Sequence, residues 1–309
     1  MSKNRPVVIA TYPPYVDHRG IFVSNSVIDE LRLNTIMPIG ESRLLVLRRL
    51  QAEAHGKKLW LDLKTRQLRI TKFAYLPYAF VELSHKIKVN LPADIYFKDG
   101  VTQVVEIVNG NKLILNQRPD TIVGDGEAVN ILDPSLQIEG FLTDNDREYI
   151  EAALELGIHD YMLSFVEQAS DVEELFKLDP QANVICKIES KRGLDFVRRG
   201  FKACKKRYGN RVRLMVARDD LYINMGESKI EILKALRAII TADKNAVVAS
   251  RLLTSMEKEG KVSLADISDW QYMRLLGFNS FLLSDGLCFR ETAARRALSF
   301  LKPLVLEAP

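Results

Sequence analysis

The second half of the chain alternates short apolar segments with helical ones, and this rhythm restricts the fold most strongly. Five apolar runs have the length and composition of strands, at residues 161–166, 184–189, 212–218, 246–250 and 280–284. Helical patterns occupy residues 171–178, 193–207, 229–242, 264–277 and 291–305. Such alternation is typical of parallel strands joined by crossover helices, and continuously apolar strands indicate a sheet that is buried on both faces.

The first seventy residues add three strands to this pattern. Apolar runs lie at residues 6–11, 32–35 and 59–63, and a helical segment at residues 41–58 precedes the third. Another helix is predicted after Thr143, which has the spacing of a capping box with Asp146. Eight strands with intervening helices predict an α/β fold of the (β/α)₈ TIM-barrel type.

A different pattern follows the third strand, from residue 71 to residue 133. Apolar residues alternate with polar ones, and turns such as "KDG" and "NGN" separate the runs. This pattern is typical of antiparallel hairpins. We therefore expect a small all-β domain at residues 71–133, inserted into a barrel that is formed by residues 1–70 and 134–309.

Charge and composition exclude several classes of protein. The net charge of +4 and the pI near 8.8 are too mild to indicate nucleic-acid binding. The three cysteines have neither the even count nor the spacing of a disulfide framework or a zinc site. No apolar run approaches the ~20 residues that span a bilayer, and the N-terminus lacks the apolar core of a signal peptide. A cytoplasmic protein without a membrane partner is expected.

Charged residues stand where two neighbouring strands are predicted to end. Lys187 and Glu189 lie two positions apart, so their side chains point to the same side of the strand. Asp220 follows the next strand. Carboxylates from adjacent strand ends suit Mg²⁺, and a lysine beside them would stabilise negative charge on a reacting oxygen. From spacing alone, a structural ion pair buried at the barrel end explains the pattern equally well.

The same residues carry a family resemblance. "CKIES" followed by "LMVARDDL" resembles the pyruvate kinase signature, which has K-I-E and then M-V-A-R-G-D-L-G. "LRLNTI", "WLDLKTRQLR" and "VASRLLTSM" are similar to further segments of that family, and "SHKIKV" resembles part of its inserted domain. The resemblance covers most of the chain in order. It implies phosphoryl transfer between phosphoenolpyruvate and ADP, or pyruvate and ATP, as in glycolysis.

The resemblance also implies roles for individual residues. Glu189 and Asp220 would bind Mg²⁺, for which Mn²⁺ could substitute, together with the phosphoenolpyruvate. Lys187 would stabilise the enolate and the transferring phosphoryl group, and Arg32 would bind the phosphate. Ser250 would supply the hydroxyl near the enolate carbon. The substrate carboxylate would be held by backbone amides of Ala217, Arg218, Asp219 and Asp220.

The sequence departs from the family pattern at the monovalent cation site. Asn34 and Asp62 match two of the four K⁺ ligands, but Ile36 and Leu63 replace the two hydroxyl residues. Apolar side chains cannot coordinate K⁺, which puts this site in doubt.

Other departures from the family pattern lie in the signature segment and at the positions that face the nucleotide. Asp219 stands in place of the first signature glycine, where its charge would repel a carboxylate, and Tyr222 in place of the second. Met37 replaces a nucleotide-side histidine, and Arg290 is the candidate to replace a nucleotide-site lysine, alongside Arg32. The chain ends at Pro309, so the family's C-terminal allosteric domain is expected to be absent. Oligomeric state stays open, with a homo-oligomer among the options.

Three functions fit these observations. The first is a Mg²⁺-dependent phosphotransferase that acts on phosphoenolpyruvate or pyruvate, and the joint presence of Lys187, Glu189, Asp220 and Arg32 favours it. The changes on the K⁺ and nucleotide side suggest a changed phosphoryl acceptor, or none. The second is a metal-dependent lyase or aldolase that uses a pyruvate enolate. The third is a non-catalytic binding or regulatory protein on the same scaffold. The balance leans towards an enzyme.

Overall fold

The computed structural model describes residues 5–97, 100–121 and 123–306, and its chain divides into two compact units. The first unit comprises Met1–Leu63 with Glu148–Pro309, and the second comprises Lys64–Arg147. The second unit extends beyond the expected insert of residues 71–133 at both ends. The flanking segments join it through main-chain contacts, since the Val129 amide donates to the Leu68 carbonyl at 3.0 Å and Gln137 pairs with Lys88.

The first unit is a barrel of eight parallel strands. Its strands are β1 (Val7–Thr11), β2 (Glu30–Asn34), β3 (Lys58–Leu63), β12 (Asp160–Leu163), β13 (Asn183–Ile188), β14 (Val212–Ala217), β15 (Val247–Ala249) and β16 (Ser280–Leu283). The barrel closes in the order β1-β16-β15-β14-β13-β12-β3-β2. This confirms the predicted (β/α)₈ barrel.

Apolar side chains fill the middle of the barrel. The cluster consists of Ile9, Trp60, Met162, Ile185, Met215, Val247, Ala249 and Leu282. Side chains two positions further along a strand face the same interior, one layer nearer the carboxyl end. That next layer holds Thr11, Asp62, Ser164 and Lys187, so the interior changes from apolar to polar at the end where barrel enzymes place their sites.

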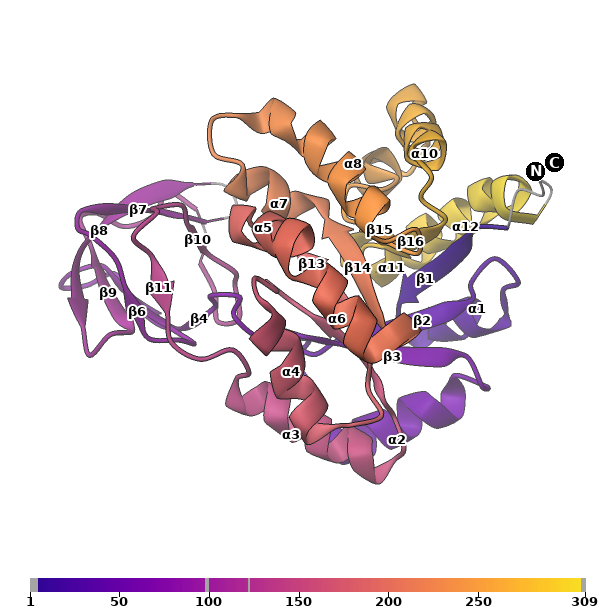
Figure 1. The fold of residues 1–309 in the computed structure, drawn as a ribbon, viewed down its shortest axis with the longest axis horizontal. Helices are drawn as coiled ribbons and strands as arrows, with labels where there is room; N and C mark the ends of the chain where they lie inside the picture. Colours follow the sequence, from indigo (N-terminus) through magenta and orange to yellow (C-terminus); the bar gives the residue numbers. More distant parts are fainter. Residues whose placement is uncertain (1–4, 98–99, 122, 307–309) are drawn as a thin grey trace. The chain divides into compact units, whose positions relative to one another are not determined.

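Helices surround the barrel strands. They are η1 (Asp17–Arg19), α1 (Gly20–Ser24), α2 (Arg43–Glu53), α3 (Asp144–Glu155), α4 (Ala169–Leu178), α5 (Lys191–Arg199), α6 (Phe201–Tyr208), η2 (Gly209–Arg211), α7 (Arg218–Asn224), η3 (Lys229–Glu231), α8 (Ile232–Ala242), α9 (Thr254–Glu259), α10 (Leu264–Leu276), α11 (Asp285–Phe289) and α12 (Glu291–Leu306). In Figure 1, α5 lies beside α6 and α8, and the last two pack on β14. Across the described residues, no helix has the length and apolar character to cross a membrane.

Some helix boundaries differ from the predicted ones. The segment at residues 193–207, expected to be a single helix, is interrupted at Gly200, which ends α5 and begins α6. A Cβ at Gly200 would lie 2.8 Å from the Phe196 ring, so a larger residue at this turn would force the ring to shift. The capping box before α3 is confirmed, because the Thr143 amide donates to Asp146 Oδ2 at 2.9 Å and the Asp146 amide to Thr143 Oγ1 at 3.1 Å.

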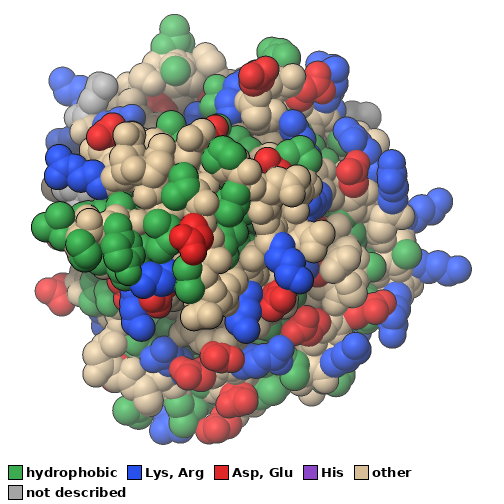
Figure 2. All heavy atoms as spheres, turned by 90° about the vertical axis from the view of Figure 1, so that its left-hand side faces the viewer, with side chains coloured by type: hydrophobic (Ala, Val, Ile, Leu, Met, Phe, Trp, Pro, Cys, Tyr) green, Lys and Arg blue, Asp and Glu red, His purple; other side chains and the backbone are tan. Residues whose placement is uncertain are grey.

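The second unit consists of antiparallel strands, as the alternating pattern predicted. They are β4 (Ile70–Ala74), β5 (Phe80–Leu83), β6 (Ile87–Lys88), β7 (Ala93–Tyr96), β8 (Val101–Val108), β9 (Lys112–Leu115), β10 (Asn130–Ile131) and β11 (Gln137–Ile138). Six of them form one sheet in the order β10-β7-β8-β9-β5-β4, and β11 pairs with β6. Figure 2 shows hydrophobic side chains gathered on the face that looks left in Figure 1. Exposed large hydrophobic residues of this unit include Phe73, Leu76 and Tyr78.

Candidate active site

Two charged side chains lie together at the carboxyl end of β13. Lys187 is the penultimate residue of the strand, and Glu189 follows its last residue. The Lys187 Nζ atom lies 3.2 Å from Oε1 of Glu189. Lys187 is only 7% exposed and Glu189 only 1%. The structure thus brings together the two residues whose spacing suggested a common direction.

Lys187 is surrounded by oxygen atoms from three neighbouring strand ends. Its ammonium donates to Asp62 Oδ1 at 3.2 Å and to Ser164 Oγ at 2.9 Å, in addition to its contact with Glu189. Burial lowers the pKa of Lys187, but the Asp62 and Glu189 carboxylates raise it, and the net direction is upward. The buried ammonium therefore stays positively charged.

Arg32 shares Asp62 with Lys187 from the opposite side. The Arg32 Nε atom donates to Asp62 Oδ2 at 2.9 Å, Nη2 donates to the same oxygen, and Nη1 donates to Thr11 Oγ1 at 3.1 Å. Burial opposes the charge of Arg32, yet the Asp285 and Asp62 carboxylates outweigh it and raise the pKa. The guanidinium is therefore fixed in position and charged at the barrel mouth.

Asp285 is a site residue that sequence reasoning did not identify. It begins α11, two residues after β16 ends, and its Oδ1 atom accepts a hydrogen bond from Arg32 Nη1. Thr11 Oγ1 donates to the same oxygen at 3.1 Å. The available signal was its place just beyond a strand end, the same feature that singled out Asp220.

The two residues expected at a K⁺ site are already engaged with other partners. Asn34 Nδ2 donates to Asp285 Oδ2 at 2.7 Å, and both oxygens of Asp62 accept from Arg32 or Lys187. Leu63 is fully buried, and its carbonyl accepts from the Ser164 hydroxyl. Two protein cations thus neutralise the carboxylate that would otherwise attract a monovalent ion.

Glu189 and Asp220 form the candidate metal pair. Burial raises the pKa of Glu189, Lys187 lowers it and the Asp220 carboxylate raises it, which places Asp220 within electrostatic reach. Glu189 Oε2 accepts the Phe165 amide at 2.7 Å, so the carboxylate is oriented from behind. Carboxylate oxygens fit Mg²⁺, which usually retains several waters. Among the described residues, no three His, Cys, Asp or Glu side chains could hold an ion, so waters and substrate oxygens would complete the coordination of Mg²⁺ by this pair.

The ends of β14 and β15 are joined by Arg218. Its Nη1 and Nη2 atoms contact the two carboxylate oxygens of Asp269 at 2.6 and 2.9 Å, and Nε and Nη2 donate to the Ser250 carbonyl at 3.0 and 2.8 Å. Ser250 has a left-handed backbone with φ of 65°. Ala217 precedes α7, so the first-turn amides of that helix lie at the barrel mouth.

The negative charge of Asp219 is compensated within the structure. Its Oδ1 atom lies 2.6 Å from Nε of Arg251, the residue after Ser250. The expectation that Asp219 would repel a substrate carboxylate overlooked this partner. Arg251 stands where the family segment A-T-Q-M-L-E-S-M has glutamine, so two departures from the family pattern form an ion pair.

Of the residues expected on the nucleotide side, Arg32 belongs to the buried charge network, whereas Arg290 and Met37 do not. Arg290 Nη1 donates to the Glu257 carbonyl at 2.9 Å, and its side chain is exposed. Met37 is buried, with 5% of its surface exposed. Met37 therefore offers no ring nitrogen in place of the histidine that the family resemblance implies at this position.

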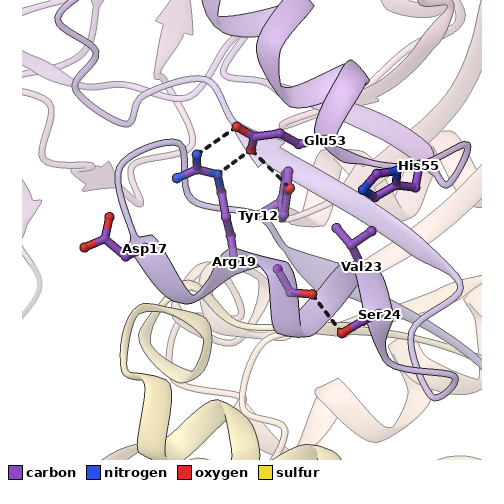
Figure 3. Close-up of a pocket in the computed structure, with 8 residues that line it drawn as sticks. Tyr12, Asp17, Arg19, Val23, Ser24, Glu53 and His55 are labelled. Carbon is purple, nitrogen blue, oxygen red and sulfur yellow. Dashed lines mark hydrogen bonds and ion pairs between the residues drawn. The ribbon is translucent and has the colours of Figure 1, made fainter.

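A separate pocket of about 500 Å³ lies beside η1, α1 and the end of α2 (Figure 3). Arg19 crosses it, with Nε and Nη2 at 2.6 and 2.9 Å from the two carboxylate oxygens of Glu53. Burial, followed by the Glu53 carboxylate, raises the pKa of Tyr12 to about 12. The lining residues include none of the charged groups described above, so this pocket is distinct from the candidate active site.

Comparisons with known proteins agree with this geometry. The family model described as pyruvate kinase, barrel domain, matches residues 54–293. A pyruvate kinase of Thermoplasma acidophilum is 30% identical over 183 residues, which is 57% of this chain and 32% of that protein. One of Borreliella burgdorferi is 24% identical over 198 residues, or 62% of this chain and 40% of that protein.

A solved structure has the same fold. The crystal structure of Cryptosporidium parvum pyruvate kinase superimposes with a TM-score of 0.73 at 20% identity, and covers 97% of this chain and 70% of that one. The matched region spans 32% and 40% of the first two curated relatives, well under half of their length. The family model covers more than half of the chain, and the matched residues include Lys187, Glu189 and Asp220 but not Arg32. The chain therefore belongs to the pyruvate kinase family.

Proposed function

We propose that this chain is a Mg²⁺-dependent phosphotransferase that handles phosphoenolpyruvate and the enolate of pyruvate. The observation that supports it most is the buried charge network in which Lys187 contacts both Asp62 and Glu189. Phosphoryl transfer is catalysed mainly by positioning and by neutralising charge. A fixed ammonium between carboxylates at a barrel mouth provides both.

Lys187 would act on the enolate oxygen. When the bond between that oxygen and phosphorus breaks, negative charge develops on the oxygen, and a buried ammonium stabilises it strongly. The upward shift of the Lys187 pKa keeps the proton on the lysine at neutral pH. Lys187 would therefore serve as an electrostatic group rather than as a base.

Arg32 would orient the phosphate, because Asp62 and Asp285 prevent its guanidinium from turning away. Ser250 would offer a hydroxyl near the enolate carbon, which must gain a proton to become pyruvate. When bound by Glu189 and Asp220, Mg²⁺ would supply Lewis-acid stabilisation of the phosphoryl and enolate oxygens.

A pyruvate-release assay tests the proposal. Purified protein receives phosphoenolpyruvate, Mg²⁺ and ADP, and pyruvate is measured over time. Lys187→Met is expected to lower turnover by about 10²–10³-fold, as loss of one such electrostatic group commonly does. Lys206→Met, which removes an exposed lysine of α6, is the control with the same change in charge.

Two outcomes would contradict the proposal. One is that wild type forms no pyruvate from phosphoenolpyruvate, Mg²⁺ and ADP. The other is an equal rate in wild type and in the Lys187→Met variant, since pyruvate formed without Lys187 would come from another site or a contaminant. A circular-dichroism melt shows whether the variant is folded, because removal of one partner from a buried ion network can cost about 3–5 kcal/mol.

A second candidate is a lyase or aldolase that uses the same metal-bound enolate. The observation in its favour is the unevenness of the site, in which Lys187, Glu189 and Arg32 form a network while Arg290 is engaged elsewhere. Nucleotide-independent release of pyruvate from a hydroxy-keto acid would identify this activity.

A further inference from the structure

Two cationic side chains lie against the ring of Tyr222 on α7, and a third, Lys191, lies near the turn that follows this helix. The Lys229 Nζ atom lies 4.8 Å from the centre of the Tyr222 ring, and the Arg251 guanidinium carbon lies 4.7 Å from it. Lys229 is held there, because its ammonium donates to the carbonyls of Tyr222 and Ile223 at 2.9 and 3.1 Å. The ring therefore keeps two cations close to each other.

Lys191 is the third cation. It begins α5, and its ammonium lies close to Gly226 in the turn after α7. The distance from the Nζ atom to the position that a Cβ of residue 226 would occupy is 3.7 Å. Burial lowers the pKa of Lys229, and the charges of Arg251 and Lys191 lower it further. The three side chains therefore repel one another. Together with the Tyr222 ring, we call them the Tyr222 cation cluster.

Only one of the three has a carboxylate partner. Arg251 pairs with Asp219 at 2.6 Å, whereas neither Lys191 nor Lys229 forms an ion pair within 4.0 Å in the part of the chain that the structure describes. Repulsion between neighbouring like charges opposes folding, and a bound anion would reduce it. The two ammonium groups that lack a carboxylate partner among the described residues would match the charge of one phosphate, which is close to −2 at neutral pH.

Residues of the Tyr222 cation cluster follow residues of the candidate active site closely in sequence. Lys191 lies two residues after Glu189, and Tyr222 lies two residues after Asp220. Arg251 directly follows Ser250. A phosphate bound to the cluster would therefore contact the same strand-end segments that carry the carboxylates proposed for Mg²⁺, among residues that depart from the family pattern.

We infer that the Tyr222 cation cluster is a binding subsite for a phosphate group of the phosphoryl acceptor. The inference rests on the proposed function for the identity of the ligand as an acceptor, but not for the binding of phosphate itself. Lysine and arginine are the usual ligands of phosphate, and the ring positions two of them. The acceptor class is thus a phosphorylated small molecule.

Calorimetric titration of the full chain with inorganic phosphate, in buffer without divalent ions, tests the subsite. Lys229→Met and Arg251→Gln are each expected to weaken phosphate binding by about tenfold or more, since each removes a charged hydrogen-bond donor. The matched controls are the exposed residues Lys206→Met and Arg198→Gln, which should change the affinity by less than about twofold. Arg251 is half exposed, so its variant should fold even if Lys229→Met does not.

The subsite is overturned if wild type does not bind phosphate, if both cluster variants bind it as well as wild type does, or if the control variants lose as much affinity. The pyruvate assay depends on Lys187, whereas the titration compares Lys229 and Arg251, which take no part in the proposed phosphoryl transfer. Failure of this test therefore leaves the pyruvate assay unaffected, and failure of the pyruvate assay leaves phosphate binding intact. Displacement of phosphate by ADP would identify a nucleotide as its source, and no displacement would identify a smaller phosphorylated acceptor.

Discussion

Asp62 accepts a hydrogen bond from the buried ammonium of Lys187 at 3.2 Å, across 125 residues of sequence. Its other carboxylate oxygen accepts from Arg32. A residue that the family resemblance assigns to a K⁺ site is therefore neutralised by two cations of the protein. The same contact holds Lys187 in place beside Glu189, so one carboxylate links Arg32, which is proposed to bind the phosphate, to Lys187, which is proposed to act on the enolate.

The first prediction is that activity does not depend on K⁺. Asp62 is already paired, and Ile36 and Leu63 provide no side-chain oxygen. The rate of pyruvate formation should differ by less than about twofold between K⁺ and tetramethylammonium salts at equal ionic strength, since only screening remains. A rate that rises severalfold with K⁺ at constant ionic strength would show that the ion binds despite these partners.

The second prediction concerns Asp285 as a positioning residue. Asp285→Asn removes a charge that faces Arg32 and weakens the hold on its guanidinium. We expect kcat/KM for phosphoenolpyruvate to fall by about tenfold, because misplaced groups cost rate. Asp285→Glu, which keeps the charge, should restore part of this loss. The exposed Asp195→Asn on α5 is the control, and an equal effect of both asparagine variants would contradict the assignment.

The third prediction concerns the metal. Glu189→Gln keeps the shape of the side chain but removes a carboxylate proposed to bind Mg²⁺. Mn²⁺ binding in the presence of oxalate, measured by electron paramagnetic resonance, should weaken by at least about tenfold. Loss of a residue that only hydrogen-bonds a metal ligand already has an effect of this size. Glu173→Gln on α4 is the matched control. Unchanged Mn²⁺ binding in Glu189→Gln would remove Glu189 from the metal site.

Much of the architecture was predictable because it depends on local patterns. Buried parallel strands are short and continuously apolar, so all eight were visible in the sequence. The capping box at Thr143 was visible for the same reason, since its partners are three residues apart. The break at Gly200 was not visible, because it depends on how closely the Phe196 ring approaches the backbone.

The candidate site was predictable only where its residues lie near one another in sequence. Lys187 and Glu189 share a strand end, and their common direction follows from the period of a strand. Asp285 contacts Arg32 across 253 residues, and Asp219 contacts Arg251 across 32. Such pairs form only when the barrel closes, so a single sequence gives no direct sign of them.

The last prediction concerns pH and His85. Burial lowers the pKa of His85, and the Asp146 carboxylate only partly opposes this. The folded state therefore keeps the ring neutral while the unfolded chain takes up a proton near pH 6.5, so the free energy of unfolding should fall as pH drops below about 6.5. Between about pH 7.5 and 5.5, urea unfolding of wild type should lose about 1 kcal/mol more than that of His85→Gln. The exposed His55→Gln should behave like wild type, and an identical pH dependence in His85→Gln would show that His85 does not contribute.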